Sequence, residues 1–285
     1  MYPILLALGA SFFFGFENVF IKLNVQKNNK ASLLMARSLI GFFISLILAY
    51  FFRQDLELWP VIITVILAAI SFFAFVFYYK AIDLGNPSIT AAIAVSRLVL
   101  ITIIGVFILK YALGYLSILW IVMIITGVVL LTVDFKKLKS RGKIEKAAVN
   151  ALISTALFGI AVGFFSYPIK LIGPYNVQMF YTLSLIIFAA LYMIYREKES
   201  IREITLNMIK SKGIFLTGLF GCLGGLSFTI ALNFGNPNIL NPISSCSPII
   251  TAIISYFLFR EKLTFQKYIG ILITTLGVIL LGYFK

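Results

Sequence analysis

The feature that most constrains this chain is a series of ten long apolar segments separated by short polar ones. A helix needs about 20 apolar residues to cross the hydrocarbon core of a bilayer, and each segment reaches that length. Their continuity favours helices over the short alternating strands of a membrane β-barrel. We therefore expect an all-α integral membrane protein with ten transmembrane helices. Their approximate bounds are 3–22, 31–52, 60–80, 87–109, 113–133, 148–170, 173–195, 213–233, 237–259 and 265–284.

The composition agrees with a membrane location. Hydrophobic residues make up 61% of the 285 residues and charged residues only 12%. A soluble domain usually carries roughly a quarter charged residues. Too few polar side chains are present to cover a globule in water. We expect a multi-pass protein of the cell membrane, with the lipid bilayer as its first partner.

Several other classes of protein are disfavoured. The chain has no histidine and no GxxxxGKS/T phosphate-binding loop. Cys222 and Cys246 both lie in apolar segments, where a cysteine is expected to be a small buried residue. The 24 Lys and Arg residues outnumber the 10 Asp and Glu, but the excess lies in short loops between spans, which indicates membrane orientation rather than nucleic-acid binding. We expect no enzyme activity, no cofactor and no metal site.

The tripeptide Gly-Asn-Pro occurs twice, at residues 85–87 and 235–237, which are 150 residues apart. The same offset without gaps places Gly127-Val128 on Gly277-Val278. Glycine suits the end of a helix and proline the first turn of the next. Each Gly-Asn-Pro is therefore expected to form the turn between two helices at the same place in a duplicated unit.

A weaker match extends the duplication to the start of the chain, where FFFGF at 12–16 aligns with ALFGI at 156–160. We predict two five-helix repeats, 1–135 and 147–285, joined by a basic cytoplasmic linker at 136–146. Because five is odd, the second repeat must enter the membrane from the opposite side to the first. Such inverted repeats are typical of secondary transporters, with the site between the repeats near the midplane.

The positions of the basic residues predict the orientation. Of the 24 Lys and Arg residues, 18 lie in the loops that follow the odd-numbered spans, and four lie on the opposite side. Basic loops stay in the cytoplasm. Both termini are therefore expected outside, with 136–146 and 196–212 inside.

The C-terminal stretch contains Pro248 in the ninth span, the helix end Arg260-Glu261-Lys262-Leu263-Thr264, and Gly270 and Gly277-Val278 in the tenth. In these features it resembles the EamA-type transporters of the drug/metabolite transporter superfamily. The stretch FFFGFENVFIK also resembles the first helix of that family, and Arg37 stands where its second helix often carries arginine. The first repeat departs from the pattern, with Lys110-Tyr111 where the second has Arg260-Glu261. The resemblance implies ten helices in two repeats and efflux or exchange of metabolites such as amino acids.

Three charged residues lie inside the spans: Glu17, Arg37 and Arg97. A charge in hydrocarbon is costly and by default points to function. At 1.5 Å per residue, Glu17 and Arg37 lie roughly 7 Å and 9 Å from the cytoplasmic ends of consecutive antiparallel helices. The matching depths predict a Glu17–Arg37 pair, which is either a structural bridge or a gate. An unpaired buried carboxyl exchanges protons near neutral pH, whereas a paired one stays ionised and carries protons poorly.

Arg97 lies roughly 15 Å deep, close to the midplane. Its repeat counterpart is Ser247, so the duplicated fold does not require a charge there. The planar guanidinium suits a substrate carboxylate or phosphate. Arg97 is expected to bind such a group, or else to pair with Glu17 or extend toward the membrane surface.

Uncharged polar residues supply further candidates for the pathway. In the ninth span, Asn238, Asn241, Ser245, Pro248, Ala252 and Ser255 follow helical spacing. Pro242 and Pro248 leave backbone carbonyls that need partners. These small residues either pack helices closely or line a pathway. The residues expected at the pathway are Asn241, Ser244 and Ser245, with Gln178 and Tyr181 of the seventh span and Tyr79 of the third.

The sequence as a whole predicts a secondary transporter that moves small organic metabolites, amino-acid-like or otherwise carboxylate-bearing, by alternating access. The alternative is a proton-coupled multidrug or cation exporter, which an unpaired Glu17 would favour. A channel or a membrane scaffold is a different class. A channel would show a polar ring repeated in both halves, whereas the halves here differ at their charged positions.

Labelling of single cysteines tests this topology. In a background without Cys222 and Cys246, cysteine at position 2 or 284 should react with a membrane-impermeant maleimide added to sealed cells. Cysteine at position 140 should react only after permeabilisation, because the basic linker is expected inside. Labelling of position 140 in sealed cells would contradict the charge argument.

Overall fold

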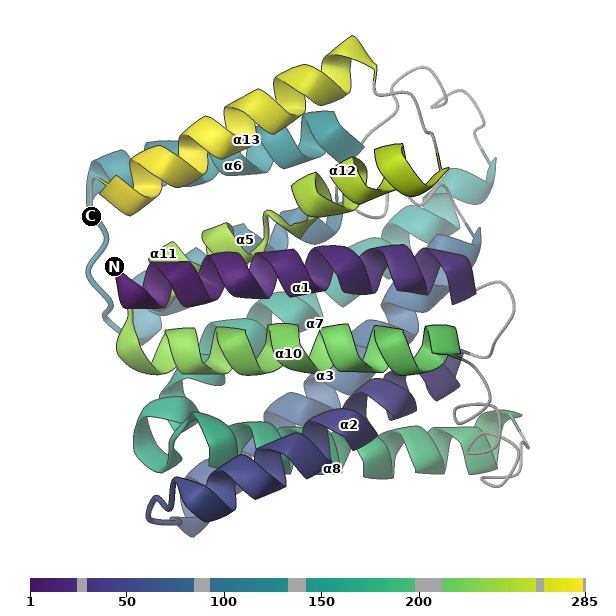
Figure 1. Ribbon diagram of the computed structural model, residues 1–285, viewed down its shortest axis with the longest axis vertical. Coiled ribbons are helices and arrows are strands. Elements are labelled where there is room, and N and C mark those ends of the chain that lie inside the picture. The colour runs from purple at the N-terminus through teal and green to yellow at the C-terminus, as the bar shows by residue number, and fades with distance from the viewer. Residues whose placement is uncertain (25–29, 85–92, 133–141, 198–211, 260–263, 284–285) are drawn as a thin grey trace. The chain divides into compact units, whose positions relative to one another are not determined.

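Figure 1 shows a computed structural model of the chain, which describes all residues except 25–29, 85–92, 133–141, 198–211, 260–263 and 284–285. Every regular element in the described ranges is a helix. In chain order they are α1 (Tyr2–Asn24), α2 (Lys30–Phe51), α3 (Leu58–Leu84), α5 (Arg97–Ile103), the π-helix η1 (Ile104–Ile108), α6 (Tyr115–Thr132), α7 (Gly142–Ile172), α8 (Pro174–Tyr192), the π-helix η3 (Met193–Glu197), α10 (Lys212–Phe234), α11 (Pro237–Ser244), α12 (Ser247–Phe259) and α13 (Phe265–Tyr283).

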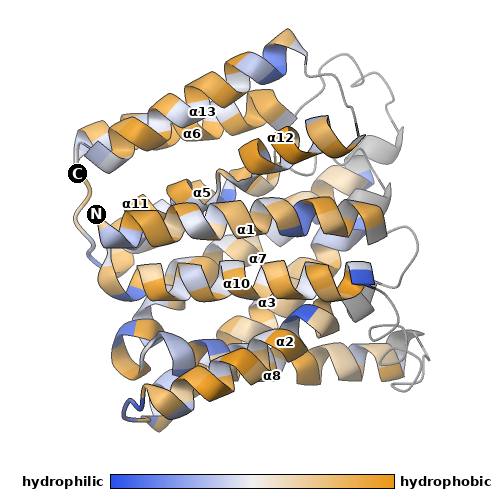
Figure 2. Cartoon of the chain, in the orientation of Figure 1, coloured by the Kyte–Doolittle hydropathy of each residue, from blue (hydrophilic) through white to orange (hydrophobic). Residues whose placement is uncertain are grey.

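Length and apolar composition confirm an all-α membrane protein. The described part of the chain contains nine segments long and apolar enough to cross a membrane, and a shorter apolar helix at Ile93–Ile108. These ten correspond to the ten expected spans. Apolar residues (orange) predominate along the helices in Figure 2. Large side chains such as Phe43 and Phe257 remain exposed, as expected of a surface that faces lipid rather than water.

The chain divides into two compact units that do not coincide with the two sequence halves. The first unit contains residues 1–72 and 165–234, and the second contains 73–164 and 235–285. The boundary between them passes through α3 and α7. Each unit therefore combines helices from both predicted repeats, while the division into repeats at 1–135 and 147–285 stays a prediction about the sequence.

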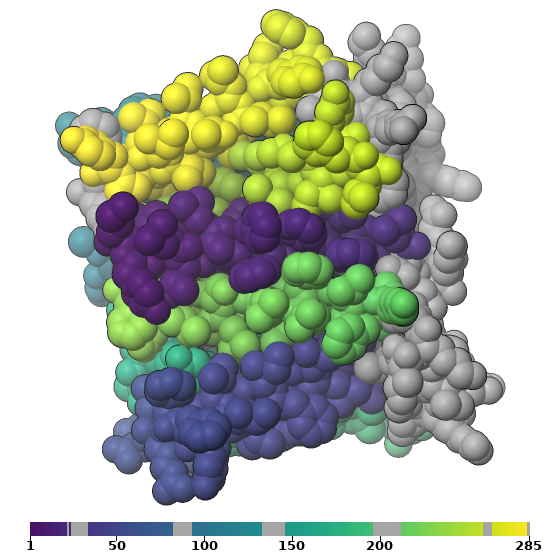
Figure 3. Space-filling model, in the orientation of Figure 1, coloured from purple at the N-terminus to yellow at the C-terminus, as the bar shows by residue number. Residues whose placement is uncertain are grey.

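In the first unit, α10 is the helix that contacts most others. It packs against α1, α2 and α8, and α2 also packs against α8. Figure 3 shows the side chains of α1 (purple) and α10 (green) in contact on the face in view. Phe220 of α10 stacks on Phe16 and Phe20 of α1, with ring centroids 5.0 Å and 5.6 Å apart. Glycine makes the approach close: a Cβ added at Gly224 would lie 2.6 Å from the ring of Phe14.

In the second unit, α6 and α13 pack closely through glycines. A Cβ at Gly270 of α13 would lie 2.7 Å from the backbone N of Leu131, and one at Gly277 would lie 2.8 Å from Ile124. Gln266 also donates a hydrogen bond from Nε2 to the carbonyl of Leu130 at 2.7 Å. Small residues that let backbones approach are typical of helix contacts in membranes, where water does not drive association.

Three pairs of helices that occupy corresponding places in the two predicted repeats contact one another. The second and seventh spans pair as α2 and α8, and the fifth and tenth pair as α6 and α13. The fourth and ninth spans meet through α5 and α11. A two-fold axis relating the repeats would produce this pairing of equivalent helices.

The turn expected at residues 235–237 is present. Helix α10 ends at Phe234 and α11 begins at Pro237. The side chain of Asn236 accepts a hydrogen bond from the backbone N–H of Asn238 at 3.0 Å, which caps α11. The first copy of the motif, at 85–87, and the helix end Arg260-Glu261-Lys262-Leu263 lie outside the described residues.

Two glycine substitutions test the packing of α6 on α13. A Cβ at Gly127 would lie 2.6 Å from the backbone N of Thr274, so Gly127→Ala should lower the free energy of unfolding by about 1–3 kcal/mol. Gly9 of α1 is the matched control, because a Cβ there meets no atom within 4 Å. Gly9→Ala should be neutral or stabilising by about 0.5–1 kcal/mol. Unfolding titrations in detergent measure both, and equal stability of the two variants would contradict the packing account.

Candidate functional site

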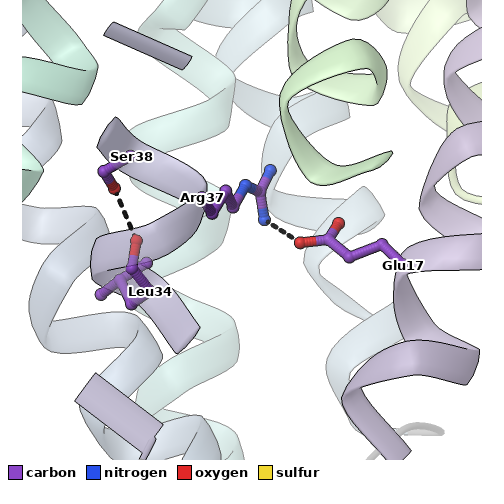
Figure 4. Close-up of polar contacts among 4 residues, drawn as sticks. All are labelled: Glu17, Leu34, Arg37 and Ser38. Atoms are coloured by element: carbon purple, nitrogen blue, oxygen red, sulfur yellow. Dashed lines mark hydrogen bonds and ion pairs between the residues drawn. The ribbon is translucent and has the colours of Figure 1, made fainter. Parts of the chain in front are cut away.

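Glu17 and Arg37 form a partly buried ion pair in the first unit (Figure 4). Nη1 of Arg37 lies 2.9 Å from Oε1 of Glu17, and the two side chains are 25% and 6% exposed. Glu17 comes from α1 and Arg37 from α2, so the pair joins two consecutive helices. One residue after Arg37, Ser38 donates a hydrogen bond to the carbonyl of Leu34 within α2 at 2.8 Å. The partner predicted for Glu17 from depth alone is therefore the one that the structure shows.

Helix α10 packs closely against this pair at Gly221. A Cβ added at Gly221 would clash with Oε1 of Glu17, and it would lie 2.7 Å from Cδ of Glu17 and 3.0 Å from Cδ of Arg37. The guanidinium carbon of Arg37 lies 5.6 Å from the centroid of the Phe14 ring, within the range of a cation–π contact. The pair therefore lies against the Phe14 ring and the glycine backbone of α10, and its two charges neutralise each other.

Three polar residues of α8 belong to the same unit. The side chain of Gln178 lies against Gly225 of α10, with Nε2 3.1 Å from the position that a Cβ would take. Thr182 packs in the same way on Gly41 of α2, with its Cγ2 3.0 Å from the position that a Cβ of Gly41 would take. Tyr181 lies within electrostatic range of Arg37 and packs edge-on against Phe165 at 5.0 Å. Gln178 and Thr182 thus pack at helix contacts, and Tyr181 is the α8 candidate within electrostatic range of Arg37.

Arg97 is in the second unit and has a different environment. It is the first residue of α5, and its guanidinium carbon lies 5.8 Å from the centroid of the Phe158 ring. Tyr78 of α3 lies within electrostatic range of it. Within the described ranges, no carboxylate lies within ion-pair distance of Arg97. The contacts that the structure gives to this cation are thus aromatic rather than anionic.

Aromatic rings extend around Arg97 on α3 and α7. Phe158 packs edge-on against Phe75, with ring centroids 4.8 Å apart, and the ring centroid of Phe75 lies 6.1 Å from that of Tyr79. The ring centroids of Tyr78 and Tyr79 are 6.2 Å apart. The predicted pathway residue Tyr79 is therefore part of the aromatic cluster that includes the ring under Arg97.

The two membrane arginines occupy related settings that differ in one group. The alignment of FFFGF with ALFGI places Phe14 on Phe158, and each of these rings lies under an arginine. One step further along the alignment, Glu17 falls on Ala161. The two phenylalanines are repeat counterparts, whereas the two arginines are not, because both lie in the first repeat, Arg37 in its second span and Arg97 in its fourth. Alanine follows Phe158 at the place where the Glu17 carboxylate follows Phe14.

The fourth and ninth spans are broken at corresponding positions. The N–H of Ser96 donates to the carbonyl of Ile93 at 3.0 Å, and the N–H of Cys246 donates to the carbonyl of Ile243 at 3.2 Å. These two turns are 150 residues apart, as are the Gly-Asn-Pro motifs. The ninth span is thus two helices, α11 and α12, and the uniform helical spacing expected from Asn238 to Ser255 is interrupted.

The two breaks have different chemical causes. Pro248 explains the second, because it has no N–H to donate to the carbonyl of Ser244. The first contains no proline. There the carbonyl of Ile93 accepts hydrogen bonds from the hydroxyls of Ser96, at 2.6 Å, and of Thr155 in α7, at 3.2 Å. Arg97 follows this first break directly.

The polar residues predicted on the ninth span are mostly bonded to their own backbone. Nδ2 of Asn241 donates to the carbonyl of Pro237 at 2.9 Å, and the hydroxyl of Ser244 donates to the carbonyl of Asn241 at 2.9 Å. Ser245 caps α11 and is 8% exposed. These three residues shape the break, and their role in a pathway stays a prediction.

Residue-type reasoning missed Phe14, Phe158 and Tyr78. The alignment of the two repeats was the signal that could have found two of them, since it pairs Phe14 with Phe158.

A rescue experiment tests the burial of the Glu17–Arg37 pair. Arg37→Met keeps the bulk of the side chain but leaves the Glu17 carboxylate without its partner. It should lower the free energy of unfolding by about 3–5 kcal/mol, the usual effect of breaking a buried pair. Adding Glu17→Gln removes the stranded charge and should recover part of that loss. A double variant no more stable than Arg37→Met would contradict the account.

Comparison with known proteins supplies the family. A search among curated proteins finds no match to this chain. One solved structure, described as "Crystal structure of protein", superposes with a TM-score of 0.81 over 99% of this chain and 99% of its own. Its sequence identity is 15%, so this likeness shows the fold alone.

The family comparison matches each half of the chain separately. The profile of the EamA-like transporter family matches residues 1–133 and again residues 145–283. Together the two matches cover nearly the whole sequence. The chain belongs to the EamA-like transporter family.

Proposed function

We propose that this membrane transporter moves small organic solutes that carry a carboxylate or a similar anionic group. The observation that carries the proposal is Arg97, a membrane arginine for which the described residues supply no carboxylate. It lies beside aromatic rings and directly after a break in the fourth span. The cell membrane is the proposed location, and efflux or exchange the proposed mode.

The energetics of charge in hydrocarbon favour an anionic ligand. An arginine at the centre of a span costs at least about 3 kcal/mol even on insertion scales, so a counter-charge is strongly favoured. Arg37 obtains one from Glu17, whereas α7, which carries the phenylalanine under Arg97, has Ala161 where α1 has Glu17. A carboxylate on the solute can accept two parallel hydrogen bonds from the guanidinium fork. The solute would then complete a pair that the first unit completes by itself.

The paired breaks favour alternating access. Broken helices at corresponding points of two repeats mark the substrate sites of many secondary transporters. Here the break in the fourth span is made by serine and threonine hydroxyls and the break in the ninth by proline. Two different chemical solutions to the same geometry indicate that the break itself is needed.

The pairing of Glu17 argues against the proton-coupled multidrug exporter. A carboxylate that already pairs with a guanidinium at 2.9 Å is less suited to carry protons than a free one. A cationic drug would also meet Arg97 as a like charge. The anionic solute is therefore the class that the geometry favours.

Binding measurements on Arg97 variants test the proposal. Leucine, leucinamide and isoamylamine share a carbon skeleton and differ in the carboxylate. Purified protein should bind leucine in preference to the other two, and Arg97→Gln should weaken that binding by about 10–100-fold. Arg97→Lys should retain the charge but lose the planar fork of the guanidinium. Its affinity for leucine should therefore lie between those of the unchanged protein and Arg97→Gln.

The matched control is Arg53→Gln, because Arg53 is an exposed arginine that lies over Tyr50 at 5.2 Å. It should leave the binding of all three compounds unchanged. An equal loss for acid, amide and amine in Arg97→Gln would contradict a role in recognising the anionic group. So would folded Arg97→Gln protein that binds leucine normally.

A further inference from the structure

Asn238 is a buried polar residue that the proposed function has not explained. It is the second residue of α11 and is 0% exposed. Within the part of the chain that the structure describes, neither Oδ1 nor Nδ2 of its side chain has a hydrogen-bond partner. A buried amide without partners destabilises the state that buries it.

Its two neighbouring asparagines are satisfied. Nδ2 of Asn236 donates to the carbonyl of Ala112 at 2.6 Å, and Nδ2 of Asn241 donates to the carbonyl of Pro237 at 2.9 Å. The contrast shows that this end of α11 offers partners to asparagine side chains. The side-chain amide of Asn238 instead lies where the described residues offer it no hydrogen-bond partner.

That place is Gly105 in the π-helix η1. A Cβ at Gly105 would clash with Oδ1 of Asn238, and it would lie 2.8 Å from Cγ and 2.9 Å from Nδ2. The side chain therefore rests on the bare Cα of Gly105, where only glycine leaves room. This contact joins the fourth span to the ninth, because η1 continues α5 and Asn238 belongs to α11.

The backbone around Gly105 departs from the α-helix. The N–H of Leu109 donates to the carbonyl of Ile104, and that of Tyr111 donates to the carbonyl of Gly105, at 2.9 Å and 2.8 Å. Lys110 has a φ of 58°, in the left-handed region. π-helical turns and left-handed residues both lie above the ordinary helix in energy and gather at functional positions. Asn238 thus contacts the fourth span at its least regular turn.

We infer that Asn238 and Gly105 form a latch between the fourth and ninth spans, in which the buried amide keeps the closed contact only marginally stable. Separation of η1 from α11 lets water or solute reach the amide and removes the penalty of burying it. An apolar residue of the same size would hold the two spans together more tightly. The inference rests on the proposed alternating access, since a latch has a use only if these spans separate.

Cysteine accessibility measures the latch directly. Ile101 lies one helical turn before Gly105 and is 2% exposed, so Ile101→Cys reports separation of the spans. The background is Cys222→Ala with Cys246→Ser, which retains a donor for the bond from Cys246 to the carbonyl of Pro242. Maleimide labelling rates are measured on protein in lipid nanodiscs, where the reagent reaches both faces of the membrane.

Asn238→Leu should slow the labelling about tenfold or more, because it removes the unsatisfied amide from the closed state. Gly105→Ala should speed it, because the added methyl displaces Asn238. If Gly105→Ala does not fold, Asn238→Ala supplies the second variant and should also slow labelling. Unchanged or faster labelling in folded Asn238→Leu would overturn the latch. No substrate is present in this assay, so its outcome is independent of whether Arg97 binds an anionic solute.

Discussion

The constraint on which this structure depends is the high energy of a charge in hydrocarbon. A charge inside a span must be neutralised, or the helix that carries it is destabilised. The first unit meets this requirement internally, through the 2.9 Å contact between Arg37 and Glu17. In the second unit, Arg97 lies over Phe158 in a related setting, but alanine replaces the acid. The proposed recognition of an anionic solute follows from that difference between the two arginine sites.

The neutralised pair also needs close packing around it, and glycine provides that packing. A side chain at Gly221 would occupy the space of the Glu17 carboxylate. In the second unit, Gly127, Gly270 and Gly277 bring α6 and α13 into backbone contact. Lipid is as apolar as leucine, so helices gain little by burying leucine against each other and gain more from close approach. The same rule explains why Asn238 can rest on Gly105.

Much of the fold could be predicted from the sequence, because hydrophobic length and charge depth are properties of a single helix. The ten spans and the Glu17–Arg37 pair followed from them, and the turn at 235–237 followed from the repeated Gly-Asn-Pro. The break at Ser96 could not be predicted, since it depends on the Thr155 hydroxyl reaching the carbonyl of Ile93 from another helix. The aromatic contacts of the arginines and the bonding of Asn241 to its own helix likewise depend on tertiary packing. The duplication predicted that the repeats correspond, but it did not predict that each compact unit would combine helices from both.

The central claim is that the solute supplies the counter-charge that Arg97 does not receive from the described residues. Solid-state NMR measures this most directly, as the dipolar coupling between leucine labelled with ¹³C at its carboxylate and protein labelled with ¹⁵N at its arginine side chains. The account predicts a coupling that corresponds to a hydrogen-bonded contact, with N and O about 3 Å apart, and that disappears in Arg97→Gln. A coupling that survives Arg97→Gln and disappears when Arg37 is replaced would contradict it.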